Sequence, residues 1–148
     1  MQSVVKRFQD LTVDELYAIL RLRAEIFVVE QDCAYQDLDD IDQEAWHVYL
    51  KEEEQVVGYL RVIEKGKRLD EVSIGRVVSL YRRKGIGRRL MEIGKMVAKD
   101  KFKATRIKIG AQVQAQPFYE KAGFVQVSEE YLEDGIPHVY MICELNKE

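Results

Sequence analysis

The sequence predicts an α+β fold in a single domain, residues 1–148, built on a mixed and mainly antiparallel sheet. Short apolar runs typical of strands recur along the whole chain. Helical periodicity interrupts them, most clearly within 13–28 and 85–101, and the order of the two kinds of element is mixed. That order favours a mainly antiparallel sheet. No repeat, low-complexity tract or Pro/Gly/Ser-rich linker divides the chain.

The first half of the chain begins with a short strand near Val4–Phe8. Thr12 followed by Glu15 then fits a capping box that opens a helix. Apolar residues recur at helical spacing after it, and we expect them to form the buried face of that helix. They are Val13, Leu16, Tyr17, Leu20, Ala24, Phe27 and Val28. The acidic stretch QDCAYQDLDDIDQE, residues 31–44, has no apolar period and is expected to be a loop.

The second half alternates strands with two helices. Trp46–Leu50 and Val56–Ile63 are expected to pair as antiparallel strands, with Val72–Leu80 beside them. Ile86, Leu90, Ile93 and Val97 then form one apolar face of a helix over 85–101. The remaining elements are a strand at 106–111, a short helix at 116–121, and strands near 124–127 and 138–145.

Composition limits the classes of partner. The net charge is -3, and a general nucleic-acid binder requires a surplus of Lys and Arg, so we expect no nucleic-acid partner. No apolar run approaches the roughly 20 residues of a membrane span, and the N-terminus does not resemble a signal peptide. We expect a cytoplasmic protein with no membrane partner. Cys33 and Cys143 lack metal-ligand spacing and are expected to be reduced thiols.

A basic glycine turn joins a strand to a helix in the segment VVSLYRRKGIGRRLM, residues 77–91. The first N–H groups of a helix have no partners inside it, and the helix dipole favours an anion there. Gly85 and Gly87 leave room for a ligand to approach. The local positive charge comes from Arg82, Arg83, Lys84, Arg88 and Arg89. The segment therefore suits a phosphate.

The alternative is a glycine turn that only starts a helix, with its cations in solvent. Two other phosphate motifs are excluded. A P-loop would end in Gly-Lys-Ser/Thr, and a dinucleotide fingerprint would have a third glycine where Leu90 stands.

Four segments together resemble one family. Arg82-Arg83-Lys84-Gly85-Ile86-Gly87 resembles the Arg/Gln-x-x-Gly-x-Gly/Ala signature of the GNAT-type N-acetyltransferases. The stretch 111–124, with its aromatic pair and Gly-Phe end, resembles the second hallmark of that family. LRLRAEIFVVEQ near the start and YLEDGIPH near the end are similar to its small ElaA-like or YjcF-like branch, so the resemblance covers nearly the whole chain.

The resemblance implies a GNAT-type sheet of about six to seven strands with helices on both faces, and acetyl-CoA as cosubstrate with no metal. It implies that the strands at 72–80 and 106–111 splay around the pantetheine arm. A bulge within Gly75–Val78 would aim a backbone N–H at the thioester carbonyl. The implied cofactor-binding residues are Val77, Val78, Arg82, Arg83, Lys84, Gly85, Ile86, Gly87, Arg88, Gln112, Phe118 and Tyr119.

Acetyl transfer requires an uncharged amine, whereas a free alkyl amine has a pKa of about 10, so a group in the site must accept a proton. His138 and Glu30 are the catalytic candidates for this step, and His47, Glu133 and Asp134 are weaker ones. For each, a hydrogen-bonding or surface role is the alternative. Tyr119 stands where many family members use a tyrosine to protonate the departing thiolate. Its alternative is a core aromatic, which we expect of Phe118.

The acceptor side is predicted by analogy alone, with Tyr131, Glu133 and Asp134 as substrate-binding candidates. Asp37, Asp39, Asp40, Asp42 and Glu44 are placed to attract a cationic amine, but a solvated loop is the expected explanation.

We therefore expect an N-acetyltransferase that transfers the acetyl group of acetyl-CoA to a primary amine of a small molecule, by direct attack in a ternary complex. A non-catalytic CoA-binding module is one alternative, against which Tyr119 argues. An interaction domain without CoA affinity is another, and it leaves the basic cluster of residues 82–89 unexplained. The sequence leaves open the acceptor and whether the chain forms a homodimer.

Overall fold

The computed structural model describes residues 1–81 and 85–145 and has one central sheet. Within these residues the sheet has eight strands in the order β1-β2-β3-β4-β5-β8-β6, and β7 also pairs with β8. The strands are β1 (Gln2–Arg7), β2 (Trp46–Glu52), β3 (Gln55–Ile63), β4 (Ser73–Ser79), β5 (Arg106–Gln112), β6 (Val125–Gln126), β7 (Tyr131–Glu133) and β8 (Ile136–Glu144). The α-helices are α1 (Val13–Arg23), α2 (Ile86–Phe102) and α3 (Gln116–Lys121). All pairings are antiparallel except β4 with β5.

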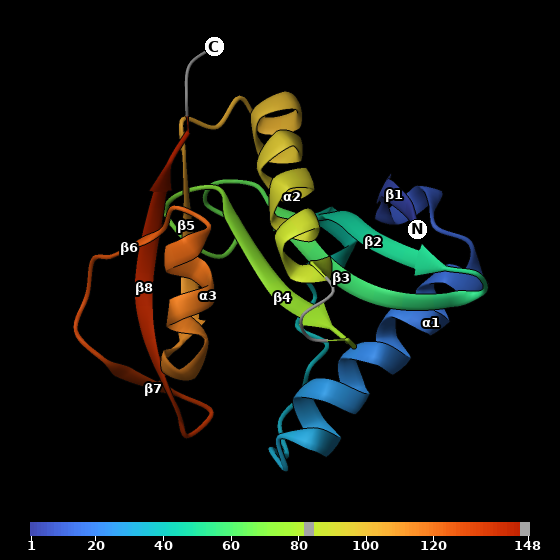
Figure 1. Ribbon diagram of the computed structural model, residues 1–148, viewed down its shortest axis with the longest axis horizontal. Coiled ribbons are helices and arrows are strands. Elements are labelled where there is room, and N and C mark those ends of the chain that lie inside the picture. Colours follow the sequence, from blue (N-terminus) through green and yellow to red (C-terminus); the bar gives the residue numbers. More distant parts are fainter. Residues whose placement is uncertain (82–84, 146–148) are drawn as a thin grey trace.

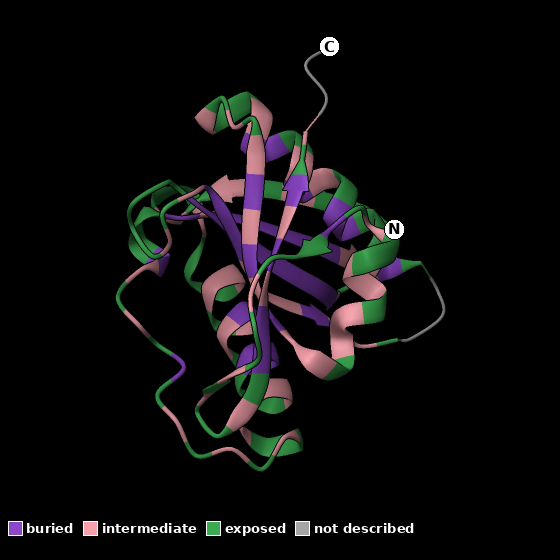
Figure 2. Cartoon of the chain, turned by 90° about the vertical axis from the view of Figure 1, so that its left-hand side faces the viewer, coloured by how far each residue is buried: buried purple, intermediate pink, exposed green. Residues whose placement is uncertain are grey.

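Helices cover both faces of the sheet because the strands alternate in the side chains they present. Leu60 and Val62 of β3 belong to the larger core cluster, together with Ile86 and Leu90 of α2. Tyr59, which precedes Leu60 in β3 and faces the opposite side of the sheet, packs with Ile19 and Leu22 of α1 in a second cluster. Figure 2 shows the buried residues concentrated on the central strands. The α+β class, the mainly antiparallel sheet and the two covered faces are as predicted.

The predicted capping box opens α1. The Thr12 hydroxyl accepts a hydrogen bond from the Glu15 N–H (3.0 Å), and the Thr12 N–H donates to the Glu15 carboxylate (2.8 Å). The predicted buried face was wrong in part, because Val13 and Tyr17 are 83% and 73% exposed. A second apolar stripe, which includes Ile19, faces the sheet instead. After Arg23 the helix continues as a π-helix over Ala24–Glu30.

The sheet divides at β4 and β5, as predicted. Ser73 and Lys108 form the single register pair between these strands, and the Lys108 N–H donates to the Val72 carbonyl (2.9 Å). Beyond that point the two strands diverge, which Figure 1 shows as an open angle between β4 and the β5–β8 half of the sheet. On its other side β5 stays paired with β8 along its whole length, 106–112.

β4 contains the predicted bulge. Tyr59 of β3 pairs with Val78, but Arg61, two residues later, pairs with Gly75, three residues earlier, so β4 has one extra residue here. Arg76 within the bulge has φ 53°, in the left-handed region.

The third strand of the C-terminal region, β7, was not predicted. It forms a tight hairpin with β8 through Asp134 and Gly135, both with positive φ (52° and 78°), as a type I′ turn requires. The segment predicted as a strand at 124–127 is paired only over Val125–Gln126. No helix in the described ranges is both long and apolar enough to cross a membrane.

Candidate active site

Three connected clefts lie around the divergence of β4 and β5. The helix cleft, about 850 Å³, is lined by Val77, Ser79, Tyr81, Gly85, Ile86, Gly87, Arg88, Gln114, Ala115, Phe118, Tyr119 and Lys121. The central cleft, about 280 Å³, lies between the diverging strands and shares Val77, Ser79, Gln114, Ala115 and Tyr119 with it. The hairpin cleft, about 650 Å³, lies beside the β7–β8 hairpin and shares Ile26, Gln31, Gln112 and Gln114 with the central cleft. The shared residues place the three clefts in a row, with the central cleft in the middle.

The N-terminus of α2 opens onto the helix cleft. Gly85 is its N-cap with φ 72°, a conformation that glycine adopts without strain, and no side chain caps the first turn. The Thr12 side chain does cap α1, so the two helix starts differ. The first N–H groups of α2 therefore have no side-chain partner in the described structure, and the first turn contains Arg88 but no acid. This end of the cleft suits an anion.

Gly87 allows close packing between two helices, which the sequence did not indicate. A Cβ at this position would lie 2.9 Å from Cε1 of Phe118, so the glycine allows α3 to pack against the first turn of α2. The Phe118 ring is partly buried against the core and contacts Tyr119 edge to face, with centroids 5.0 Å apart. Phe118 thus both packs and lines the helix cleft.

The predicted basic residues divide into two groups. Arg82, Arg83 and Lys84 lie outside the described residues. Arg88 lines the helix cleft with its side chain 83% exposed, 4.0 Å from Glu92. Lys121 at the end of α3 lines the same cleft and was missed, because only the folded chain brings α3 beside the start of α2.

Tyr119 lies where the helix cleft meets the central cleft, since it lines both. Its hydroxyl has no hydrogen-bond partner among the described residues, and burial raises the pKa of the phenol to about 12. Val77 also lines both clefts, and Val78 lines the central one. The predicted cofactor residues of β4, α2 and α3 that the structure describes thus come together.

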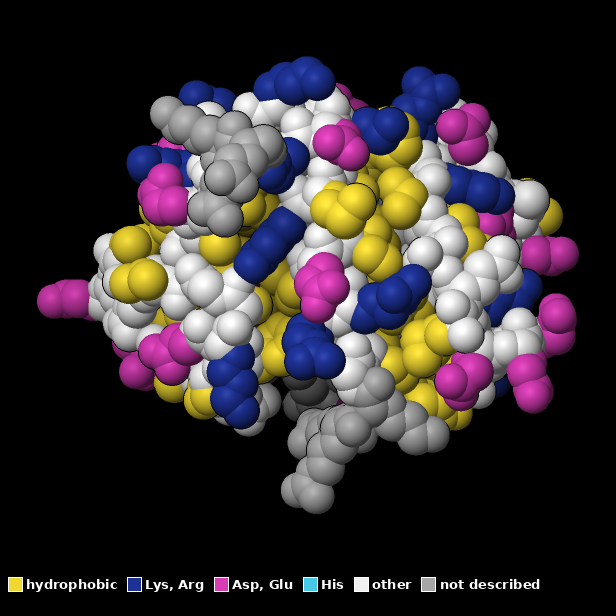
Figure 3. Space-filling model, turned by 45° about the horizontal axis from the view of Figure 1, so that its top comes forward, with side chains coloured by type: hydrophobic (Ala, Val, Ile, Leu, Met, Phe, Trp, Pro, Cys, Tyr) yellow, Lys and Arg dark blue, Asp and Glu magenta, His cyan; other side chains and the backbone are white. Residues whose placement is uncertain are grey.

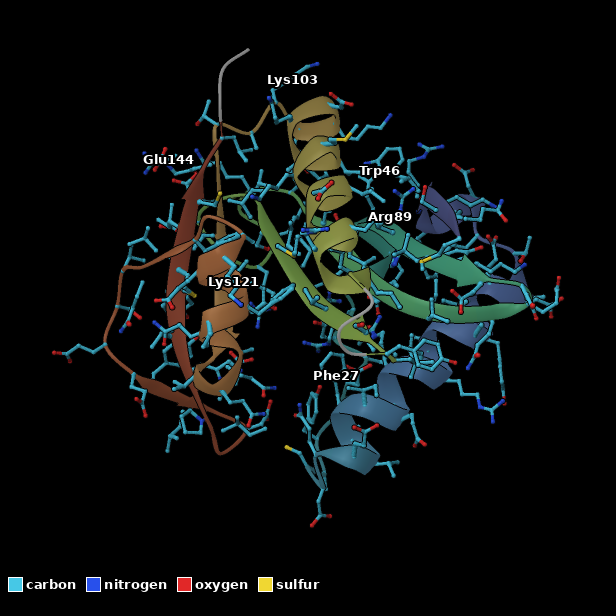
Figure 4. All side chains as sticks on the ribbon, viewed as in Figure 1. Phe27, Trp46, Arg89, Lys103, Lys121 and Glu144 are labelled. Atoms are coloured by element: carbon cyan, nitrogen blue, oxygen red, sulfur yellow. The ribbon has the colours of Figure 1, made fainter. Side chains whose placement is uncertain are left out.

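Two glutamines connect the halves of the molecule on the far side of the central cleft. The side-chain amides of Gln31 and Gln112 exchange hydrogen bonds of 3.3 and 3.5 Å. Gln31 follows the π-helix, which also places Phe27 in the central cleft on the side toward β5 and β8 (Figure 4). Gln31 was missed, because nothing in the sequence connects residues 31 and 112.

His138 lines the central cleft from β8 and is 6% exposed. Its Nδ1 lies 2.7 Å from the Ile136 carbonyl oxygen, which can only accept, so Nδ1 bears the proton of the neutral ring. Nε2 then has the lone pair and lies 3.9 Å from the Glu133 carboxylate. Arg68, also missed, approaches the same carboxylate at 3.5 Å.

The other acceptor-side candidates are more dispersed. Glu30 lines the hairpin cleft, not the central one. Tyr131 stacks on Tyr140, with centroids 4.6 Å apart, and its hydroxyl lies over Gly110 of β5. Gly110 lines the central cleft, but Tyr131 itself lines none of the three clefts. Burial raises the pKa of Tyr131. Asp134 belongs to the hairpin turn, where its carbonyl accepts from the Cys33 thiol (3.5 Å).

The expectation of a solvated acidic loop was wrong for three residues. Asp37 and Asp42 are 8% and 6% exposed, and with Asp39 they form an ionic cluster with Arg23, Arg61 and Arg76. Burial opposes ionisation of Asp42, but hydrogen bonds from Arg23 and the charges of Arg23 and Arg61 hold its pKa below the ordinary value. The loop is thus tied to the interior by residues distant in sequence.

His47 belongs to this buried region and not to a cleft. Its Nε2 donates to the Asp42 carbonyl (2.8 Å), so its Nδ1 accepts from the Tyr59 hydroxyl (2.6 Å). Burial lowers the pKa of the imidazole. Among residues 1–81 and 85–145, no three His, Cys, Asp or Glu side chains gather as a metal site would require.

A family model for the acetyltransferase (GNAT) domain matches residues 12–145. The chain belongs to the GNAT acetyltransferase family. A UPF0039 protein of Schizosaccharomyces pombe is 42% identical over 98% of each chain, and ElaA of Escherichia coli is 37% identical over 92% of each.

Solved structures of this family show the same fold. An acyl-CoA N-acyltransferase from Pseudomonas aeruginosa superposes with a TM-score of 0.89 at 40% identity, over 97% of this chain and 99% of that one. The structure of Escherichia coli ElaA gives a TM-score of 0.89 at 35% identity with the same coverage. The resemblance to the ElaA-like branch is confirmed.

Proposed function

We propose that the protein transfers the acetyl group of acetyl-CoA to a primary amine of a small molecule, within a ternary complex. The observation that carries the proposal is the path of three clefts through the divergence of β4 and β5. Its two large ends meet at a narrow centre, so two reactants entering from opposite sides would meet there. Family membership supplies the acyl-CoA chemistry.

The helix cleft is the proposed acetyl-CoA site. The uncapped N–H groups of α2 would donate hydrogen bonds to the pyrophosphate oxygens, and Arg88 and Lys121 would supply positive charge at the mouth. The thioester would then lie in the central cleft between Val77 and Tyr119. A phenol with a pKa of about 12 stays protonated at neutral pH, so the Tyr119 hydroxyl can donate a hydrogen bond to the departing sulfur.

The hairpin cleft is the proposed entrance for the amine. Its charged lining residues are Glu30 and Glu130, and no cation is among the described residues that line it, so the cleft favours an ammonium ion. His138 Nε2 would take the proton that the ammonium must lose. The amine nitrogen then bonds to the acetyl carbon as the carbon–sulfur bond breaks, and the products are an amide, CoA and one proton.

A covalent acetyl-enzyme on cysteine is disfavoured by position. Cys143 is buried in the core, and the Cys33 thiol donates a hydrogen bond to the Asp134 carbonyl in the hairpin turn. Neither cysteine is among the residues that line the three clefts. Direct attack in a ternary complex needs no such nucleophile.

Calorimetric titration with acetyl-CoA tests the proposed site. Arg88→Glu reverses one charge at the helix cleft without altering a buried contact, whereas a substitution at Gly85 would also strain the backbone. We expect a micromolar Kd for the wild type, and about tenfold weaker binding, about 1.4 kcal/mol, for the variant.

Lys65→Glu is the matched control, since it makes the same charge change at an exposed position away from the three clefts. Absence of acetyl-CoA binding by folded wild type, or equal weakening by both variants, would contradict the proposed site.

A further inference from the structure

Arg76 adopts an unusual backbone conformation inside the β4 bulge. Its φ of 53° lies in the left-handed region, where bulges of this kind normally have glycine. The neighbouring Gly75 has open space beside it but does not take that conformation. A strained residue persists only where surrounding contacts compensate for it.

Asp37 supplies those contacts. Its Oδ1 lies 2.7 Å from Arg76 Nε, and its backbone carbonyl accepts from Arg76 Nη2 at 2.9 Å. The other carboxylate oxygen of Asp37 accepts from Nε of Arg23 (2.9 Å), a side chain with no exposed surface. Asp37 is therefore fixed from one side by a buried arginine and holds Arg76 from the other.

The bulge faces the cleft in which the acyl group is proposed to lie. Gly75, Arg76, Val77 and Val78 all line the central cleft. β4 pairs with β5 only at Ser73, so its edge beyond that residue has no partner strand on the cleft side. The conformation of Arg76 consequently sets the direction in which the next N–H groups point.

We propose that Asp37 is a positioning residue that acts through Arg76. It holds the β4 bulge so that a backbone N–H is presented to the acyl carbonyl oxygen. The inference rests on the proposed function, and it assigns the acidic loop a part in acyl binding in place of attraction of the amine.

Affinities for acetyl-CoA and for free CoA, measured by calorimetry, isolate the acyl contact without knowledge of the acceptor. Asp37→Asn keeps the size of the side chain and removes its charge. We expect the ratio of the CoA Kd to the acetyl-CoA Kd to fall about threefold to tenfold, the contribution of one hydrogen bond. Asp40→Asn is the control, because Asp40 is exposed in the same loop and no ion pair is found for it in the described structure.

Arg76→Gly provides a second test in case Asp37→Asn fails to fold. Glycine accepts the left-handed conformation, and both Asp37 and Asp39 keep their other arginine partners. We expect the same fall in the affinity ratio. With an amine substrate we expect kcat to fall by about 10- to 100-fold and KM for acetyl-CoA to rise by the same threefold to tenfold as its Kd, and Arg76→Lys to recover part of the loss.

A folded Arg76→Gly protein with wild-type affinity ratio and kcat would overturn the inference and leave the proposed function intact. A wild type that binds neither acetyl-CoA nor CoA would overturn both.

Discussion

Replacing Tyr119 with Phe removes one hydroxyl at the junction of the helix and central clefts. The edge-to-face contacts of its ring with Phe118 and Phe124, at 5.0 and 5.9 Å between centroids, remain. The hydroxyl has no hydrogen-bond partner in the described residues, so the free energy of unfolding should change by less than about 0.5 kcal/mol.

The expected effect on catalysis is much larger. Burial raises the pKa of Tyr119 to about 12, whereas a thiol has a pKa of about 8.5. Complete proton transfer from the phenol to the thiolate is therefore uphill by about 3.5 pK units, or about 5 kcal/mol. The hydroxyl should act by donating a hydrogen bond to the developing charge, and loss of such a donor lowers kcat by about 10²- to 10³-fold.

The assay is release of the CoA thiol at saturating acetyl-CoA, with the Kd for acetyl-CoA measured alongside and expected to be unchanged. Tyr17→Phe is the matched control, since Tyr17 is 73% exposed on α1. Because the Tyr119 pKa is near 12, its ionisation should add no limb to the pH profile between about 6 and 10. A Tyr119→Phe enzyme with kcat within about twofold of wild type would refute the assigned role.

Two further predictions concern stability. Arg23→Leu removes one cationic partner from the buried carboxylates of Asp37 and Asp42. The free energy of unfolding, measured by urea titration, should therefore fall by about 3–5 kcal/mol. A fall of less than about 1 kcal/mol would contradict a stabilising role of the ionic cluster. For Glu15, burial raises the pKa, but hydrogen bonds from the Thr12 backbone, Tyr49 and Lys6 outweigh it and lower the value from 4.5 to about 2. The stability that Glu15 contributes is therefore complete above about pH 4.5 and is lost as the pH falls toward 2. The urea midpoint should fall over that range, and it should fall less steeply with pH in Glu15→Gln. An equal pH dependence of the urea midpoint in the two proteins would contradict the lowered pKa of Glu15.

Local signals in the sequence predicted most of the fold. The Thr12–Glu15 capping box, the apolar face of α2 and the strand order around β2, β3 and β4 depend on residues close together in the chain. The buried face of α1 was predicted less well, because Val13 and Tyr17 form one apolar stripe and Ile19 and Leu22 another. Only the position of the sheet decides between two such stripes.

In the candidate site, too, residues with local sequence signals were predicted and residues paired over long sequence separations were not. Gly85, Arg88 and Tyr119 lie in motifs with local signals, and the structure brings them to one cleft. Pairings across long sequence separations, such as Gln31 with Gln112 or Asp37 with Arg76, leave no periodic trace in one sequence. For that reason Asp37, Asp39 and Asp42 of the acidic loop were mistaken for solvated residues.

Positive and negative side chains are mixed on one face of the molecule, in agreement with the small net charge of -3. Figure 3 shows Lys and Arg side chains interspersed with Asp and Glu over this face rather than separated from them. On this face, attraction of the proposed anionic cosubstrate would therefore depend on local features and not on a broad field.

Amine-dependent release of CoA tests the central claim most directly. The protein would be incubated with saturating acetyl-CoA and a panel of polyamines, aminosugars, amino acids, peptides and lysine derivatives, and free thiol and N-acetylated product would be measured together. We predict thiol release that requires an amine and matches the amide formed, one for one, with intersecting initial-velocity lines as both substrates vary. Folded protein that binds acetyl-CoA but releases thiol with none of these amines would contradict the claim and favour a non-catalytic CoA-binding module.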